Sequence, residues 1–419
     1  MSAIPYILIL SALLPYLPYG LRVEHVLVPA LMLWPIFSAK RIHAETPLIV
    51  GGLMVGALAA AYFSQQSLET GADADPLSQF VRLLLPVFGL MALPSVLPQQ
   101  DNVAVKVSEA AAVAGALAAT FTALSLFSSL AQTLLIFWVQ GQEGSVWLNA
   151  YDVGRYTGIF NQPIEAGIFY SVCLIGAVHA YRYGKMNRIV LLLAMALIIF
   201  GGSASLSKNF IVLGTACALG YAFMNKLLSR SLLVILSIPI IAAAPMGLQR
   251  LNINYISSLR DLYSDQGLIG ALSAGRFGSE GGSVSMLFES LFVSGDWLTG
   301  RGLGSQLPLD SGYLEYFYQG GILSLAGYVL ALAVLSWYGW ANRAHRDGPL
   351  LMVLMGYIWL SSAGGPTITA SRTGIIVVIL VSACLVSIRR YRESALYLPQ
   401  SRSGPNHSAR IFLHATDPA

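Results

Sequence analysis

The chain has 419 residues, of which 56% are hydrophobic and only 11% are charged, whereas charged residues make up about 25% of an average soluble domain. So apolar a composition excludes a single water-soluble core and indicates a protein embedded in a lipid bilayer. The net charge of +4 does not indicate nucleic-acid binding, because the basic residues are distributed over the segments between apolar runs.

Repeated apolar runs predict the secondary structure. A membrane-spanning helix needs about 20 largely apolar residues, because a helix rises about 1.5 Å per residue and the hydrocarbon layer is about 30 Å thick. We therefore expect an all-α, polytopic integral membrane helix bundle with about 12 transmembrane helices, which form a single domain over residues 1–392. Residues 107–140 are long enough for one tilted span followed by an interfacial helix. The expected spans are residues 3–18, 22–39, 46–64, 79–98, 107–128, 162–181, 188–205, 208–228, 231–247, 312–339, 349–363 and 373–388.

Lysine and arginine in short loops predict the orientation, because they are enriched on the cytoplasmic side. One set of alternating loops carries such residues, so both termini are expected in the cytoplasm. The tail, residues 393–419, is polar and is predicted to be disordered. The cytoplasmic set comprises Lys40, Arg41, Lys106, Arg182, Lys185, Arg188, Lys226, Arg230, Arg343, Arg346, Arg389, Arg390 and Arg392.

Other cations fall on the predicted outer side. Lys208 and Arg372 lie in short hairpins at the membrane surface, and a cation costs about 2.5–3.5 kcal/mol at the bilayer centre and less near an interface. Such residues tend to have an anionic partner, although solvation alone is the alternative for cations in long loops. The remaining outer cations are Arg155, Arg250, Arg260, Arg276 and Arg301, with Arg22 and Arg82 near the same side.

The longest outer loop covers residues 248–311. Apolar residues recur over 284–292 at the spacing of an amphipathic helix, which we expect to lie along the interface. The glycine-rich stretches 275–282 and 300–304 each contain an arginine. Backbone amides in such stretches can cradle an anion, and a flexible loop is the alternative.

Several stretches between about residues 150 and 330 occur in an order that resembles a known family. They are RYTGIFNQP (155–163), SASLSK (203–208), GRGLG (300–304), DSGYLE (310–315) and GGI (320–322). Together they resemble the bacterial O-antigen polymerase and O-antigen ligase superfamily. Lys208 stands where the family has an arginine. The ligases carry His-Asn where this chain has Asp310-Ser311, and the long outer loop contains no histidine. The resemblance is therefore closer to the polymerases.

The resemblance implies a glycosyltransferase with a lipid-linked donor. A polymerase transfers a growing glycan from undecaprenyl diphosphate onto a lipid-linked repeat unit at the outer face of the bacterial inner membrane. Donor and acceptor are both undecaprenyl-diphosphate-linked oligosaccharides, and a chain-length regulator and a flippase of the same pathway are implied partners. The alternatives are an O-antigen ligase, which transfers the glycan to lipid A core, and a membrane transporter or flippase.

The resemblance also implies roles for particular residues. Cations aimed at the departing diphosphate would stabilise the charge that develops on it, and a carboxylate would accept the proton of the incoming sugar hydroxyl. The candidate catalytic acids are Asp310, then Glu315. The diphosphate ligands are Arg155, Arg276 and Arg301, with Lys208 and Arg372 as auxiliaries, and the substrate contacts are Asn161, Glu165 and Tyr313.

Some of these residues have a structural alternative. Asp310 is also placed to cap a helix that starts near Gly312. Asn161 with Pro163 has the pattern of a helix N-cap followed by an early proline, and Glu165 is placed to pair with an outer arginine. No cofactor is expected. Asp73-Ala-Asp75 has the form of the metal-binding motif of nucleotide-sugar transferases. Nucleotide sugars are cytoplasmic, whereas this loop is predicted to lie outside, so no metal is expected either.

Overall fold

The computed structural model describes residues 4–15, 45–65, 76–139, 144–227, 283–303 and 311–397, with a few single residues besides. Two predicted spans, 22–39 and 231–247, and the tail beyond residue 397 lie outside these ranges. Disorder was predicted from residue 393 onward, but residues 393–397 continue the last helix.

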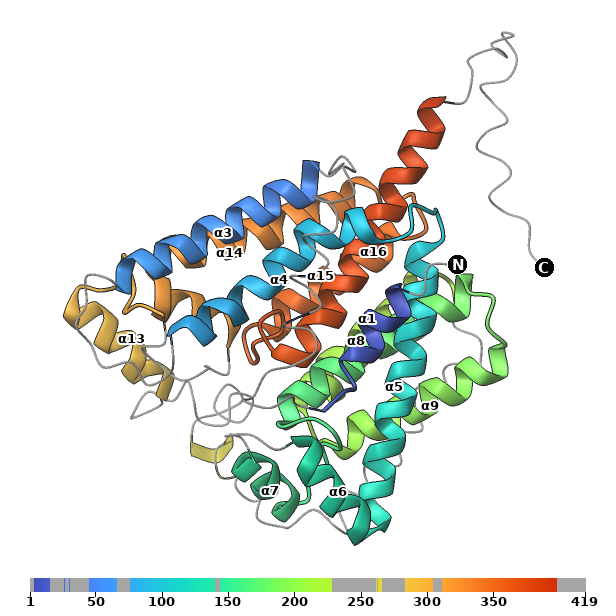
Figure 1. Ribbon diagram of the computed structural model, residues 1–419, viewed down its shortest axis with the longest axis horizontal. Coiled ribbons are helices and arrows are strands. Elements are labelled where there is room, and N and C mark those ends of the chain that lie inside the picture. The colour runs from blue at the N-terminus through green and yellow to red at the C-terminus, as the bar shows by residue number, and fades with distance from the viewer. Residues whose placement is uncertain are drawn as a thin grey trace.

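Every regular element of the described chain is a helix (Figure 1), which confirms the predicted all-α class. Most helices begin and end close to the predicted bounds. The elements are α1 (Ile4–Ser11), α3 (Glu45–Gln65), α4 (Pro76–Val96), α5 (Val103–Phe127), α6 (Ser129–Val139), α7 (Gly144–Asp152), α8 (Pro163–Tyr183), α9 (Arg188–Ala204), the π-helix η2 (Asn209–Gly214), α10 (Thr215–Met224), α13 (Ser283–Ser294), α14 (Gly312–Ala341), α15 (Gly348–Ser361) and α16 (Ser371–Tyr397).

Length and composition allow four of these helices to cross a membrane. These segments are Val103–Leu126, Pro163–Tyr183, Gly312–Ala341 and Arg372–Ser394, and shorter apolar helices accompany them. A helical membrane protein is therefore supported, while the number of twelve spans stays a prediction. The stretch 107–140 does divide into two helices, because the backbone is extended at Ser128 between α5 and α6.

The helices form a bundle around two buried ones. In the span of α16, 94% of the residues are buried, and in that of α8, 89%, as expected for helices that are apolar on all sides. α16 packs against α4, α5 and α8, and α8 packs in turn against α5 and α9. On the other side of the bundle, α14 lies along α3, with α13 at its end (Figure 1).

α14 is interrupted at Gly321, whose backbone (φ 67°, ψ −166°) is not helical. The segment after α13 is hydrogen-bonded across this interruption. The amide of Arg301 donates to the carbonyl of Tyr318 (2.8 Å), that of Gly302 to Gln319 (3.0 Å), and that of Ile322 to the carbonyl of Trp297 (2.9 Å).

This arrangement uses two of the amides expected to cradle an anion. The 300–304 stretch was predicted to be an anion cradle or a flexible loop, yet the amides of Arg301 and Gly302 bind helix carbonyls that the interruption would otherwise leave unpaired. The amphipathic helix predicted over 284–292 is confirmed as α13, and Leu291 is buried against Phe317 and Tyr318 of α14. Its position at a membrane interface stays a prediction.

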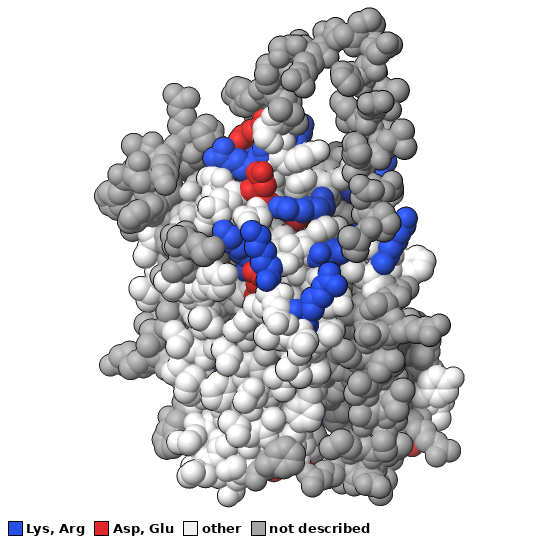
Figure 2. Space-filling model, turned by 90° about the vertical axis from the view of Figure 1, so that its right-hand side faces the viewer, with Lys and Arg blue, Asp and Glu red and all other residues white. Residues whose placement is uncertain are grey.

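The loops predicted to be cytoplasmic meet at one end of the bundle. Arg346 donates to the carbonyl of Asp101, and Arg389 donates to the side chain of Gln99. Figure 2 shows Lys and Arg side chains gathered across the upper part of one face, with the described surface below them almost without charge. We call the end of the bundle that carries these cations the basic end. Its Lys and Arg residues are Lys106, Arg182, Lys185, Arg188, Lys226, Arg343, Arg346, Arg389, Arg390 and Arg392.

The loops predicted to lie outside meet at the opposite end, which we call the site end. The amide of Tyr156 donates to the carbonyl of Ala204 (2.9 Å), and the amide of Gly312 donates to that of Ser362 (2.9 Å). The site end comprises residues 155–165, 203–209, 297–303, 311–315 and 362–372, together with Arg82, which pairs with Glu315.

We predict that Gly321→Ala destabilises the protein by more than about 2 kcal/mol. A residue with a Cβ pays about 1–3 kcal/mol for this positive-φ backbone, which is essentially restricted to glycine, and the added Cβ would overlap the carbonyl of Leu298. The matched control is Gly220→Ala in α10, where nothing lies within 4 Å of the added carbon, and we expect no loss there because alanine is the better helix former. Thermal unfolding of the detergent-solubilised variants measures both. Equal stability of the two variants would contradict the role assigned to the interruption.

Candidate functional site

Two buried carboxyl groups lie at the site end. Glu315 is fully buried and Glu165 is 8% exposed. Each lies in the first turn of its helix, α14 and α8 respectively, where the helix dipole favours a negative charge. Burial of a carboxylate is costly unless a charge or hydrogen bonds compensate it, so the partners of these two residues define the site.

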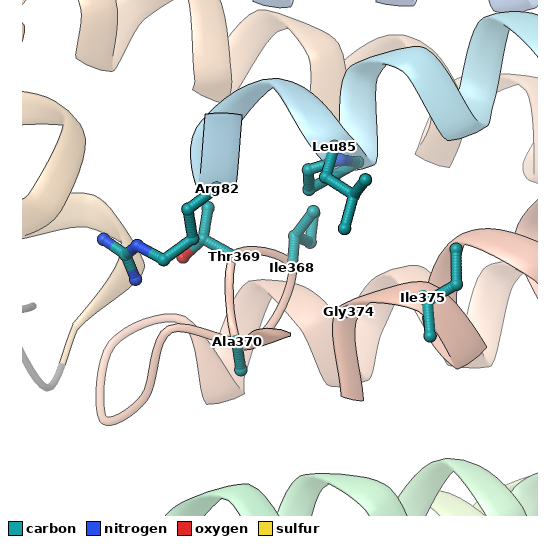
Figure 3. Close-up of a pocket in the computed structure, with 8 residues that line it drawn as sticks. Arg82, Leu85, Ile368, Thr369, Ala370, Gly374 and Ile375 are labelled. Carbon is teal, nitrogen blue, oxygen red and sulfur yellow. The ribbon is translucent and has the colours of Figure 1, made fainter. Parts of the chain in front are cut away.

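Glu315 is held by residues from two other segments. Arg82 of α4 forms an ion pair with its Oε1 atom, and the hydroxyl of Thr369 donates to its Oε2 atom at 2.5 Å. Figure 3 shows Arg82 beside Thr369 at a small pocket between α4 and the segment that leads into α16. The pocket is lined by Arg82, Leu85, Ile368, Thr369, Ala370 and Ile375, with Pro86 and Gly374.

Glu165 binds backbone amides. Its Oε1 atom accepts from the amide of Arg372 at 3.2 Å, and its Oε2 atom accepts from the amide of Asn161 at 3.3 Å. The backbone amide of Arg372 thus contacts Glu165, while the predicted pairing of Glu165 with the charge of an arginine side chain stays a prediction. This carboxylate joins the 155–163 stretch to the start of α16.

The guanidinium group of Arg372 is directed into the protein. Its side chain is 1% exposed, and it donates to the carbonyl of Ile159 and to that of Trp138, the latter at 3.3 Å. Backbone carbonyls carry partial negative charge and accept the fork of donors that arginine presents. Arg372 thus fastens the 155–163 stretch and α6 to α16.

One short segment carries the contacts to both carboxylates. Thr369 binds Glu315 and Arg372 binds Glu165, so the segment 362–372 lies between the two acids. In the same segment, the carbonyls of Ser362 and Gly365 accept hydrogen bonds from the amide of Gly312. The side chain of Asn209 lies against Gly365. Three other parts of the chain, namely α14, α8 and η2, therefore converge on this segment.

The predicted N-caps are wrong at two positions. α14 is capped by Ser311, whose hydroxyl accepts from the amide of Leu314 and donates to the carbonyl of Ser362, so Asp310 is not the cap. α8 begins at Pro163 after Gln162, so Asn161 is not a cap either, while the early proline is confirmed. In both cases the sequence pattern admits neighbouring start positions, and tertiary contacts select one.

The remaining predicted site residues fall into three groups. Arg301 belongs to the segment that follows α13 in the sequence, and its side chain pairs with that of Asp296 at 3.3 Å. The hydroxyl of Tyr313 donates to the carbonyl of Trp359 at 2.7 Å, which directs it toward α15. Arg155 and Lys208 are half-buried at the site end. Asp310 and Arg276 lie outside the described residues.

The hairpin that carries Lys208 has an unusual backbone. Leu206 has a positive φ of 49°, which is costly for a branched residue and persists only where the surroundings hold it. The hydroxyl of Ser205 donates to the carbonyl of Gly202 at 2.7 Å, and η2 starts directly after Lys208. This geometry places Lys208 at the end of α9 beside the 155–163 stretch.

Arg82 and Thr369 were not among the predicted site residues. Arg82 could have been found, because an arginine inside an otherwise apolar run requires a partner. Thr369 carries no such signal, because a threonine in a membrane segment commonly satisfies its own helix backbone.

A second polar cluster was also missed, and it lies at the basic end. His179 Nε2 is 3.1 Å from Asp347 Oδ1, and His179 Nδ1 is 2.6 Å from the hydroxyl of Tyr221. Ser387 donates to the other oxygen of Asp347. His179 and Asp347 are fully buried, so this cluster joins α8, α10, α16 and the residue before α15.

The chemistry available at the site end is that of fixed acids and cations. Arg82 forms an ion pair with Glu315, and half-exposed cations at the same end can bind an anionic group. Within the part of the chain that the structure describes, no group of three or more His, Cys, Asp or Glu side chains could hold a metal ion. Comparison with known proteins finds no matching family model and no matching curated protein.

We predict that Arg82→Leu and Glu315→Leu each destabilise the protein by about 3–5 kcal/mol, because each leaves a buried charge without its partner. The double variant removes both charges and should lose less than the sum of the two. The control is the half-exposed pair Arg390–Glu393, where single substitutions should cost less than about 1 kcal/mol. Denaturant unfolding in detergent measures this cycle, and strict additivity at Arg82 and Glu315 would contradict the pairing.

Asp347 predicts an acid-dependent stability. Its burial acts to raise its pKa, but the hydrogen bond and charge of His179, the hydroxyl of Ser387 and the charge of Arg346 keep the pKa below its ordinary value. The carboxylate therefore stabilises the fold above the unfolded pKa of about 3.9, and this contribution is lost as the pH falls through the folded pKa. Unfolding measured against pH should lose part of its acid dependence in Asp347→Asn. Glu289→Gln, at an exposed site on α13, should leave the profile unchanged.

Proposed function

We propose that the protein is a membrane glycosyltransferase that transfers a growing glycan from undecaprenyl diphosphate onto a lipid-linked repeat unit, at the outer face of a bacterial inner membrane. The observation that supports this most is the site end itself. There two buried carboxylates, Glu165 and Glu315, and the cations Arg82, Arg155 and Lys208 come from distant parts of the chain to the end of the bundle opposite the basic end.

In this proposal, the half-exposed cations bind the diphosphate. As the anomeric carbon–oxygen bond breaks, the departing diphosphate gains negative charge, and fixed cations stabilise that state more than the ground state. Arg155 and Lys208 are half-buried and retain access to solvent. The guanidinium group of Arg372 is buried and directed at carbonyls, so we assign it to positioning the Arg155 stretch.

In this proposal, Asp310 is the base that accepts the proton of the acceptor hydroxyl. Glu315 is the weaker candidate, because it is fully buried and engaged by Arg82 and Thr369. Its role in this proposal is to fix the first turn of α14. The cap residue Ser311, at the start of that turn, directly follows Asp310 in the sequence.

A transporter is the second candidate, and the interrupted helix α14 is the observation that favours it, because transporters bind substrate at interrupted helices. Two features weigh against this candidate. The carbonyls of Tyr318 and Gln319 at the interruption are bound by the amides of Arg301 and Gly302, so these two carbonyls are occupied. The cations also lie at the two ends of the bundle.

We predict that purified protein in lipid nanodiscs converts an undecaprenyl-diphosphate-linked repeat unit into a ladder of longer glycans. Arg155→Gln should lower the rate by about 10²–10³, the usual cost of one electrostatic donor, and Asp310→Asn by about 10²–10⁴. The matched control is Arg343→Gln, an exposed arginine at the basic end, which should leave the rate unchanged.

Each other outcome has a meaning. Single transfer to a lipid A core acceptor without a ladder would identify a ligase, and movement of the lipid-linked sugar across the bilayer without a new glycosidic bond would identify a flippase. Full activity of both site variants at equal protein level would refute the assigned site.

A further inference from the structure

The turn between α8 and α9 concentrates positive charge at the basic end. Arg182, Lys185 and Arg188 stand three residues apart, and all three are exposed. In the described part of the chain, no salt bridge joins any of them to an acid. They belong to the band of cations visible in Figure 2.

This turn is held in one conformation from within the bundle. The carboxylate of Glu109 on α5 accepts the amides of Lys185 (2.6 Å) and Met186 (2.9 Å). The side chain of Asn187 accepts the amide of Ile189 (2.8 Å) and so caps α9. Because Glu109 binds the backbone, the three cationic side chains point away from a preorganised turn. Glu109 is also the nearby opposing charge, so the three cations and Glu109 together carry a net charge of +2.

Tyrosine rings lie beside the arginines of the turn. The guanidinium of Arg182 is 5.8 Å from the ring centre of Tyr183, and that of Arg188 is 5.8 Å from the ring centre of Tyr181. Tyrosine prefers the level of the lipid headgroups, and a cation over its ring is held there by the ring quadrupole. Such contacts are those expected of arginines that lie at headgroup level.

An apolar helix face continues directly from the turn. Ile189 and Leu193 of α9 are 68% and 62% exposed, and Val190 and Leu197 are exposed as well. Ile189, Leu193 and Leu197 recur every four residues, so they form one stripe along the helix. Exposed aliphatic side chains on a helix that borders a bilayer are covered by acyl chains.

We propose that the turn at residues 181–188 binds the headgroup of an anionic phospholipid whose acyl chains lie along the Ile189–Leu193–Leu197 stripe of α9. The net positive charge favours a headgroup with net negative charge, such as phosphatidylglycerol, over zwitterionic phosphatidylcholine. The proposal concerns the basic end and is independent of the function proposed for the site end.

Lipid titration of the full chain tests this proposal. Native mass spectrometry of the detergent-solubilised protein would follow binding of phosphatidylglycerol and of phosphatidylcholine. Each cation near an anionic lipid contributes about fivefold in affinity, so the variant Arg182→Gln/Lys185→Gln/Arg188→Gln should bind phosphatidylglycerol roughly a hundredfold more weakly and phosphatidylcholine unchanged. High salt should reduce the preference of the wild type.

The matched control is Lys226→Gln/Arg343→Gln/Arg392→Gln, which removes three other exposed cations from the same end and should keep the preference. If both triple variants lose the preference for phosphatidylglycerol, the attraction is diffuse and there is no site. If the variant at Arg182, Lys185 and Arg188 retains that preference, the proposal is overturned. The single variant Lys185→Gln, expected to lose about fivefold, serves as the readout if the triple variant unfolds. Displacement of the lipid by soluble glycerol phosphate would contradict the part assigned to α9.

Discussion

A carboxylate buried in an apolar bundle must be compensated, and this constraint organises the site end. Its desolvation costs on the order of several kcal/mol, which the ion pair with Arg82 and the hydrogen bond from Thr369 offset for Glu315. Because these partners come from α4 and from the segment before α16, burial of one acid fixes three parts of the chain relative to one another. Glu165 does the same through the amides of Asn161 and Arg372. The segment 362–372 carries contacts to both acids.

The two ends of the bundle use buried polar groups differently. At the basic end, His179 and Asp347 are fully enclosed and join four segments below a surface of cations, as expected of a structural tie. At the site end, the buried acids lie next to half-exposed cations, Arg155 and Lys208, so buried and accessible charges adjoin. The interruption of α14 lies near this end, where the segment 297–302 satisfies the helix carbonyls. That contact links the segment after α13 to the helix that carries Glu315.

Much of the architecture could be predicted from the sequence alone. Apolar runs and turn residues are local properties, and they placed helices such as α3, α8, α9, α14 and α15 close to their observed bounds. The spacing of apolar residues over 284–292 predicted α13. Charge also carried information, because a cation in an apolar setting requires a partner. Applied to Arg82, that rule would have predicted an acidic partner, although it does not specify which acid.

Composition and periodicity thus determined the helical, membrane-embedded character of the protein, the approximate ends of its helices and the gathering of cations on one side. Only the tertiary structure decided which charges meet. Arg82 and Glu315 are 233 residues apart in the chain, and no local pattern specifies such a pairing. The structure also decided that Ser311 caps α14, that Arg372 points inward, and that the amides of Arg301 and Gly302 bind a helix. The physical reason is that each of these outcomes depends on which donor or acceptor a distant segment brings within hydrogen-bonding reach.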